Sequence, residues 1–427
     1  MIYFFFLLGF TAQLYLPFER NYQDNVDNYL SALLKNYIAT TLCFGEPQKQ
    51  CLKLNIETKE YSTWILSSKS NHLEKQIFYK QSQSESFYLT DTSQFQFSFT
   101  KYRTVHLSCD TLFINDDITI KEFSFLLCEN FSEKDLPINS GVIGLGVQST
   151  RPEVTNGINL IGQLRKKRFI SSYSFAFIYE ENNSKFIQKY EKGKLIIGEY
   201  PHEYINCKGL KLIYETTTTV SLSNLLWGVT FDSVLYGEEM LTKDSTAYIA
   251  IEFGFILGPE EYQNKTDEQF FNAQIDKGKC KKEIVEEFVI YTCDTNTNIK
   301  SFPDLVFKKR NYNITLTKND LFSIKDNRMI FMVIFPVYFN MFFGSDWRLG
   351  MPFLYSIPTV FDIDKKQIGF YIDSHLVDKT IIEIMTVILK YLIIILIVIG
   401  VLFGISILVI KWRRKARKNI YYTAMKQ

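Results

Sequence analysis

The chain has 427 residues, a formal net charge of +2, and 46% hydrophobic against 22% charged residues. These values indicate a folded protein that is long enough to bury more than one core, and they exclude a disordered chain. The nearly balanced charge gives no electrostatic reason to expect nucleic acid as a partner. The 37 Phe and 26 Tyr residues, together with many β-branched ones, favour an all-β body.

The N-terminus is an apolar run, residues 1–10, followed by the small residues Thr11 and Ala12. The run is too short to span a bilayer and is typical of the core of a signal peptide, although no positive charge precedes it. We interpret residues 1–13 as a signal peptide. A buried N-terminal strand is the alternative.

Between residues 25 and 372, short segments rich in Val, Ile, Phe and Tyr alternate with turn-forming residues, which predicts strands. Residues 94–99 alternate Gln or Ser with Phe, as expected for a strand with one buried face. Helices are predicted only at 158–167, where apolar residues share one face, and at 260–274. No Gly-rich or Pro-rich linker precedes residue 373.

A weak internal doubling connects residues 140–146 (SGVIGLG) with residues 346–352 (DWRLGMP). Each segment runs through apolar residues to a glycine and continues into a helix-like stretch. Two β lobes that close in the same way would produce this pattern.

The C-terminal part contains an uncharged apolar run, residues 391–410, which matches the thickness of a bilayer. We therefore predict a linker at 374–389, a transmembrane helix at 390–410 and a cytoplasmic tail at 411–427. The positive-inside rule keeps the basic cluster after the helix in the cytoplasm, so the body lies in a secretory or endolysosomal lumen or at the cell surface. The cluster consists of Lys411, Arg413, Arg414, Lys415, Arg417 and Lys418.

Cysteines and glycosylation sequons all lie before the predicted helix, on the side where disulfides persist. The odd number of seven cysteines leaves one thiol over, and Cys207 has no obvious neighbour. The four Asn-x-Ser/Thr sites are Asn130, Asn182, Asn264 and Asn313.

The sequence contains no motif for metal, nucleotide or serine-hydrolase chemistry. The four histidines do not have metal-ligand spacing, and the chain has neither a P-loop nor a G-x-S-x-G elbow. We therefore expect no metal and no cofactor.

Several segments, in this order along the chain, resemble the pepsin-type aspartic peptidases. They are 36–50 (NYIATTLCFGEPQKQ), 64–67 (WILS), 140–146, 193–198 (GKLIIG), 227–233 (WGVTFDS) and 347–371 (WRLGMPFLYSIPTVFDIDKKQIGFY). The resemblance implies an all-β, bilobal double β-barrel or sandwich with an inter-lobe sheet. Its lobes would be residues 14–200 and 201–373, and Trp64 would belong to the cleft between them.

The resemblance also bears on the disulfides. Cys280 and Cys293, followed by Phe302-Pro303-Asp304, are similar to the family's disulfide region in the second lobe. Cys43 and Cys51 are predicted to pair across the first hairpin, where a tight antiparallel pairing supplies the short Cα separation. Cys109 with Cys128 is the predicted third pair.

Members of this family hydrolyse peptides with two Asp-Thr/Ser-Gly loops, whose carboxylates share a proton. The first loop here reads Glu57-Thr58-Lys59. An ungapped alignment of the second loop puts Ala250 at the aspartate position. A two-residue shortening gives Glu252-Phe253-Gly254 instead, and we prefer it because it keeps both an acid and a glycine. Thr58 and Gly254 would then support the loops.

These substitutions predict impaired catalysis. Glutamate moves each carboxylate outward by a methylene, and catalytic groups tolerate displacements of only about 0.5 Å. Lys59 beside Glu57 would favour the ionised carboxylate and oppose proton sharing. We expect a monomeric membrane protein that binds a peptide or protein segment in its cleft. The alternatives are an active endopeptidase that uses Glu57 and Glu252, and a structural surface glycoprotein.

The topology yields the first testable prediction. Glycosylation mapping should find sugar on at least one of the four sequons, because they precede the membrane span. A protease added to intact vesicles should remove only residues 411–427. Protection of that tail, together with digestion of the body, would overturn the predicted orientation.

Overall fold

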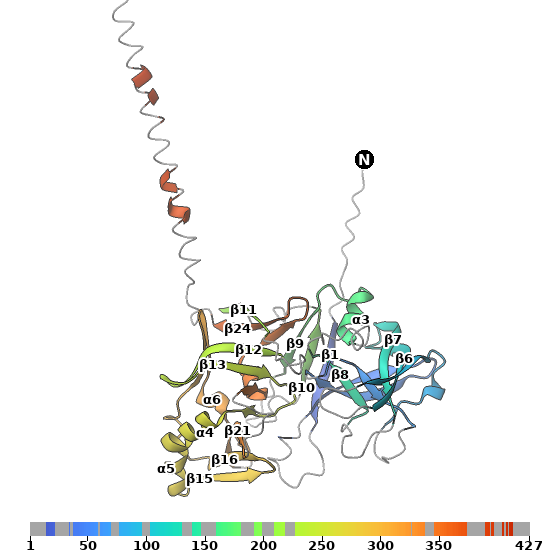
Figure 1. The fold of residues 1–427 in the computed structure, drawn as a ribbon, viewed down its shortest axis with the longest axis horizontal. Helices are drawn as coiled ribbons and strands as arrows, with labels where there is room; N and C mark the ends of the chain where they lie inside the picture. The colour runs from blue at the N-terminus through green and yellow to red at the C-terminus, as the bar shows by residue number, and fades with distance from the viewer. Residues whose placement is uncertain are drawn as a thin grey trace, which may run out of the picture. The chain divides into compact units, whose positions relative to one another are not determined.

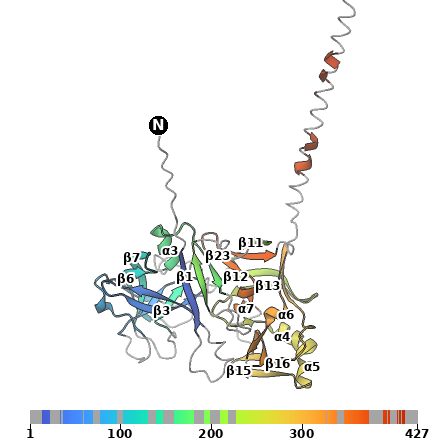
Figure 2. The ribbon, with the colours of Figure 1, turned by 180° about the vertical axis from the view of Figure 1, so that it is seen from behind.

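A computed structural model of the chain describes residues 14–21, 37–58, 60–69, 77–95, 103–129, 139–146, 159–180, 192–198, 209–217, 227–325, 327–337 and 346–373. It also describes Leu34 and scattered positions between 389 and 412. Residues 1–374 form one compact unit and residues 375–427 a second. The first unit consists mainly of strands (Figures 1 and 2), which confirms the mostly-β prediction.

Within the described residues, the first half of the chain contains ten strands and two short helices. They are β1 (Leu14–Asn21), β2 (Tyr37–Phe44), β3 (Gln50–Glu57), β4 (Trp64–Leu66), η1 (Gln81–Gln83), β5 (Tyr88–Phe95), β6 (Arg103–Phe113), β7 (Thr119–Cys128), β8 (Gly141–Gly144), α3 (Leu160–Lys166), β9 (Ser174–Tyr179) and β10 (Lys192–Ile197).

In the second half, the structure describes fourteen strands and five helical segments up to residue 373. The strands are β11 (Leu210–Thr216), β12 (Gly228–Tyr236), β13 (Glu239–Ile249), β14 (Ile256–Leu257), β15 (Cys280–Val285), β16 (Phe288–Asp294), β17 (Leu305–Lys309), β18 (Tyr312–Leu316), β19 (Phe322–Lys325), β20 (Arg328–Phe331), β21 (Val333–Pro336), β22 (Trp347–Leu349), β23 (Thr359–Asp362) and β24 (Gln367–Asp373). The helical segments are α4 (Glu260–Thr266), η5 (Asp267–Phe271), α5 (Asn272–Asp276), α6 (Lys318–Leu321) and α7 (Met351–Ser356).

Both predicted helices are confirmed. Asn159 caps α3 by accepting a hydrogen bond from the backbone of Gly162, and Leu160, Ile161 and Leu164 face the core. In the second half, the predicted helix at 260–274 forms as α4, η5 and α5, with π-helical geometry over η5.

The strands form two sheets. A 13-stranded sheet has the order β11-β24-β23-β9-β10-β1-β2-β3-β8-β4-β7-β6-β5. An 11-stranded sheet has the order β18-β17-β12-β13-β22-β14-β21-β16-β20-β19, and β15 pairs with β16. Because β11, β23 and β24 belong to the second half of the chain, the first sheet joins the two halves through the pairing of β9 with β23.

Aromatic side chains pack at this junction. Phe175 of β9 and Phe361 of β23 lie opposite each other in the sheet and stack with ring centroids 4.6 Å apart. Trp227, fully buried, contacts both rings edge-on at 5.8 and 5.1 Å. Its indole Nε1 donates to the carbonyl of Leu145, 2.9 Å away in the first half of the chain. Each such aromatic pair contributes about 0.5–1.5 kcal/mol beyond its buried area.

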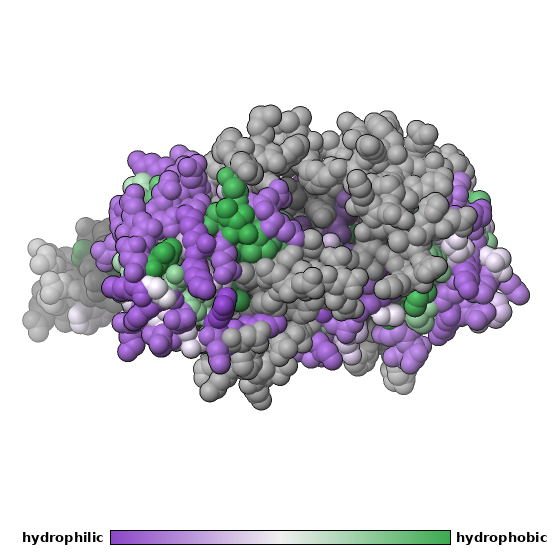
Figure 3. All heavy atoms as spheres, turned by 90° about the horizontal axis from the view of Figure 1, so that it is seen from below, coloured by the Kyte–Doolittle hydropathy of each residue, from purple (hydrophilic) through white to green (hydrophobic). Residues whose placement is uncertain are grey.

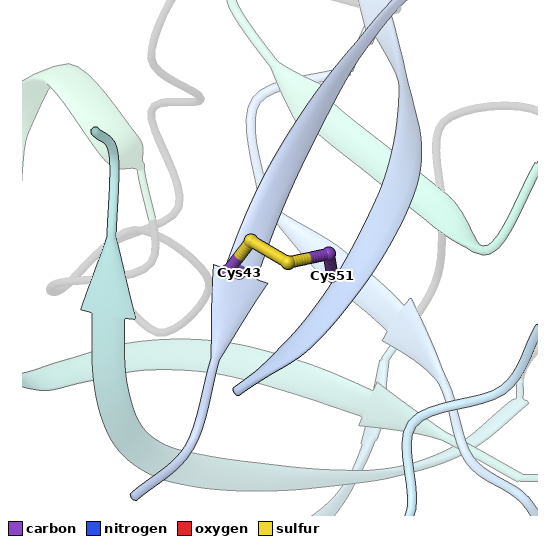
Figure 4. The surroundings of a disulfide bond; sticks show 2 residues. All are labelled: Cys43 and Cys51. Atoms are coloured by element: carbon purple, nitrogen blue, oxygen red, sulfur yellow. A yellow bond between two sulfur atoms is a disulfide. The ribbon is translucent and has the colours of Figure 1, made fainter. Parts of the chain in front are cut away.

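Two disulfides each join residues that lie directly opposite in an antiparallel pair. Cys43–Cys51 connects β2 with β3 (Figure 4), and Cys280–Cys293 connects β15 with β16. The Cα atoms are 3.9 and 4.0 Å apart, so the register brings each pair within bonding reach. Both predicted pairings are confirmed.

The predicted third bond is wrong, since no disulfide joins Cys109 and Cys128. They lie on the adjacent strands β6 and β7, but Cys109 faces Ser124 whereas Cys128 faces Val105. The Sγ atom of Cys109 lies 3.3 Å from Ser124 Oγ instead. Strand register, which spacing along the chain does not reveal, separates the two thiols. Cys207 lies outside the described residues.

The predicted span 390–410 lies largely outside the described residues. Its described positions are helical, with exposed apolar side chains such as Leu392, Ile395 and Leu408. Among the residues that the structure describes, no helix is long and apolar enough to cross a membrane. The transmembrane helix and the signal peptide stay predictions.

Non-reducing peptide mapping tests this cysteine pattern. We expect peptides linked through Cys43–Cys51 and Cys280–Cys293, and alkylation of Cys109 and Cys128 after unfolding. Replacing both Cys43 and Cys51 by Ser should lower the free energy of unfolding by about 2 kcal/mol, because the unfolded chain gains freedom. A Cys109–Cys128 peptide from the unreduced protein would contradict the register.

Candidate active site

Glu57 ends strand β3 at the centre of the first lobe. Strand β3 runs parallel to β8, where Glu57 lies opposite Gly144. The backbone carbonyl of Glu57 accepts a hydrogen bond of 2.8 Å from Leu145 N, which fixes the end of the strand. The side chain is only 7% exposed. The predicted first acid therefore lies at the start of a loop that is held by the neighbouring strand.

Strand β13 ends in the same way in the second lobe. It runs parallel to β22, with Ile249 opposite Leu349, and Ala250 N donates to Leu349 O at 3.0 Å. Beyond the loop, β14 lies antiparallel to β22, with Leu257 opposite Arg348. The internal doubling of the sequence thus corresponds to two equivalent strand arrangements.

Register decides which residue of the second loop is equivalent to Glu57. In the first lobe, Ile56 pairs with Ile143, and Trp64 beyond the loop pairs with Val142. In the second lobe, Ile249 and Leu257 pair with the corresponding positions of β22. Both loops have the same length, so no shortening occurs.

Ala250 is therefore the counterpart of Glu57, and the gapped alignment that we preferred is wrong. Ala250 is 5% exposed and has no titratable group. The family's Asp-Thr/Ser-Gly motif corresponds to Ala250-Ile251-Glu252, which puts Glu252 at the glycine position. A shift of two residues within the loop would change the pairing of β13 or of β14 with β22, and both pairings are kept.

Two glycines hold these loops at equivalent positions. A Cβ atom on Gly144 would lie 2.4 Å from the backbone carbon of Tyr61, and one on Gly350 would lie 2.0 Å from Phe255 O. In both lobes the glycine of the neighbouring strand thus allows the loop backbone to approach closely. The contacts support the equivalence of the loops independently of the strand register.

Glu252 nevertheless reaches the first loop. The hydroxyl of Thr58 donates to Glu252 Oε2 at 3.4 Å, and Thr58 is 1% exposed. This long hydrogen bond connects the two lobes next to Glu57. The structure therefore brings together the two predicted loops, through residues at the second and third positions of their motifs.

Arg348 of β22 adds a cation to the site, which the sequence analysis did not single out. Burial lowers the pKa of Arg348, and the negative charge of Glu252 opposes this shift. The guanidinium also lies over the ring of Phe253, 5.9 Å from its centroid. Glu252 and Arg348 therefore interact electrostatically across the loop. The internal doubling of residues 140–146 and 346–352 could have pointed to Arg348, because Arg348 is equivalent to Val142 in the first lobe.

The other predicted site residues are scattered. Trp64, 7% exposed, packs in the core of the first lobe with Leu66 and Val142, so its predicted contribution to a cleft stays a prediction. Gly254 is buried in the second loop. Lys59, Asn130 and Asn182 lie outside the described residues.

The remaining two sequons lie on regular structure, Asn264 on α4 and Asn313 on β18. No group of three His, Cys, Asp or Glu side chains suited to a metal occurs among the described residues. On the face of the molecule opposite to β11 and β24, the described residues are mostly hydrophilic, with a few hydrophobic patches among them (Figure 3).

The two lobes, their shared sheet and the paired loops define a bilobal pepsin-like fold. The profile described as eukaryotic aspartyl protease matches residues 36–371, and the chain belongs to this family. The crystal structure of aspartic proteinase from Irpex lacteus has a TM-score of 0.60 and 16% identity, and the match covers 85% of this chain and 98% of that chain. A search among curated proteins finds no match.

Replacing Gly350 by Ala tests the role of the glycines. The new Cβ would collide with Phe255 O, so we expect a loss of about 2–4 kcal/mol in the free energy of unfolding, measured in urea. Gly278→Ala is the control, because no atom lies within 4 Å there and only its φ of +67° is unfavourable, which costs about 1 kcal/mol. Equal losses in the two variants would contradict the close approach.

Proposed function

We propose that this family member does not hydrolyse peptides efficiently and instead binds a peptide or protein segment between its lobes. The observation that carries the proposal is Ala250 at the position equivalent to Glu57. A single carboxylate cannot divide the roles of base and acid between two groups, and a missing acid–base group typically costs about 10²–10⁴ in rate.

The surroundings of Glu252 support the same conclusion. Its carboxylate interacts with the positive charge of Arg348 and accepts a hydrogen bond from Thr58. A general acid must hold a proton, and a neighbouring cation makes this harder. The bilobal fold supports binding, because ligand sites occur preferentially where two parts of a fold meet.

We further propose that a single C-terminal helix anchors the protein in a membrane, with the lobes in a secretory or endolysosomal lumen or at the cell surface. The uncharged run at 391–410 and the basic residues that follow it support this topology. The two disulfides fit an oxidising compartment.

One observation favours a second candidate, an active endopeptidase that uses Glu57 and Glu252. Thr58, next to Glu57 in sequence, contacts Glu252 across the lobes, so the two glutamates belong to adjoining loops. In this candidate the longer side chain of Glu252 would replace the acid that is missing at Ala250.

A peptidase assay separates the two candidates. The purified full-length chain is incubated in detergent with a denatured protein mixture from acidic to neutral pH, and cleavage is read by mass spectrometry with and without a transition-state-mimicking peptide inhibitor. We expect no inhibitor-sensitive cleavage by the natural sequence. Turnover that Glu57→Gln or Glu252→Gln abolishes would establish the second candidate.

A restored variant serves as the positive control. It combines Glu57→Asp, Lys59→Gly, Ala250→Asp, Ile251→Thr and Glu252→Gly, which rebuilds an Asp-Thr-Gly sequence in both loops. We expect it to gain inhibitor-sensitive cleavage. Peptide binding by the natural chain is measured in parallel, and its absence would contradict the binding proposal in favour of a structural glycoprotein.

A further inference from the structure

Strand β1 has a cation on its buried face. Burial alternates along the strand, so that Leu14, Leu16, Phe18 and Arg20 all face inward. The first three are apolar, whereas Arg20 has a guanidinium that stays charged at any physiological pH. Arg20 is only 6% exposed. A charge so deeply buried normally has a partner of opposite sign.

The hydrogen bonds of Arg20 do not supply such a partner. Its Nη2 donates to the hydroxyl of Tyr355, a neutral acceptor, at 3.2 Å. The Nε and Nη1 atoms are buried and meet no acceptor in the part of the chain that the structure describes. No ion pair with Arg20 occurs there either. Buried donors of a charged group are seldom left unpaired.

A second unpaired polar group lies beside the guanidinium. The hydroxyl of Tyr179 on β9 is buried and has no hydrogen-bond partner among the described residues. Its ring packs edge-on against that of Tyr355 at 4.6 Å and against Phe18 at 5.4 Å. Burial raises the pKa of Tyr179 to about 12, although the positive charge of Arg20 opposes the shift, so the hydroxyl keeps its proton and remains a donor.

We propose that Arg20 and Tyr179 form a buried binding site for a carboxylate, with Tyr355 orienting the guanidinium. Among the described residues at the site, every unpaired group is a donor and the charge is positive, so the ligand that fits them is an acceptor and an anion. Arginine suits the planar carboxylate, to which it donates charge-assisted hydrogen bonds. A single guanidinium balances one negative charge, which favours a carboxylate over a doubly charged phosphate.

The carboxylate could come from a small free anion or from the terminus of a peptide, and the chemistry at Arg20 is the same for both. The proposal does not depend on the activity of the loops around Glu57. The site involves β1 and β9, which lie on either side of β10 in the shared sheet (Figure 1).

Thermal unfolding of the full-length chain in detergent tests the site with sodium formate, against sodium chloride of equal ionic strength. We expect saturating formate to raise the midpoint of the natural chain by at least about 2 °C more than chloride. Arg20→Met should abolish the difference, and Tyr179→Phe should reduce it. Arg165→Met is the matched control, because Arg165 has a 43% exposed side chain that pairs with Asp364; it should retain the full response.

Without formate, Arg20→Met should unfold at the same temperature as the natural chain or higher, because it removes an unpaired buried charge. If this variant does not fold, Arg20→Lys replaces it, and a weaker formate response is expected since lysine lacks the planar donors. A tripeptide with a free C-terminus, compared with its amide, separates the two sources. An equal response to chloride, or a formate response that persists in Arg20→Met, would overturn the proposal.

Discussion

The pairing of β9 with β23 is the interaction on which the rest of the structure depends. It brings residues from the end of the chain into the sheet of the first lobe, with Phe361 stacked on Phe175. Trp227 packs on both rings and donates to Leu145 O, directly after β8. Strand β8 holds the Glu57 loop, and the carbonyl of Trp227 accepts a hydrogen bond of 2.8 Å from Ile249 N at the end of β13. This aromatic contact therefore fixes the two loops relative to each other. Aromatic rings combine a large buried area with defined geometry, which suits them to this role.

The same arrangement limits what the site can do. Parallel pairing holds the start of each loop and antiparallel pairing holds its end. Gly144 in the first lobe and Gly350 in the second contact the backbone in the middle of the loop. A residue within such a loop cannot slide to replace a missing neighbour. Ala250 therefore leaves one acid position without a carboxylate. Glu252, two residues further along the loop, accepts a hydrogen bond from Thr58 and interacts with the charge of Arg348.

Two errors of the sequence interpretation have one physical cause. The gapped alignment kept an acid and a glycine by allowing a shift of two residues, and the sequence analysis paired Cys109 with Cys128 as the third disulfide. In both cases the register of the sheet decided otherwise, because β-strands pair residue by residue over their whole length. Arg348 was missed for a related reason, since its proximity to Glu252 arises only when β13, β14 and β22 pair.

Patterns along the chain were enough to predict the strand-rich class, both helices, the two confirmed disulfides and the resemblance that the family match bears out. These features depend on local periodicity, on hairpins close in sequence or on motifs, all of which can be read along the chain. The folded structure was needed to identify Ala250 as the counterpart of Glu57 and to bring Arg348 close to Glu252. It was also needed to show that Arg20 and Tyr179 have buried donors without partners among the described residues. Such facts depend on contacts between residues far apart in sequence, and these contacts follow from strand register and packing rather than from residue type.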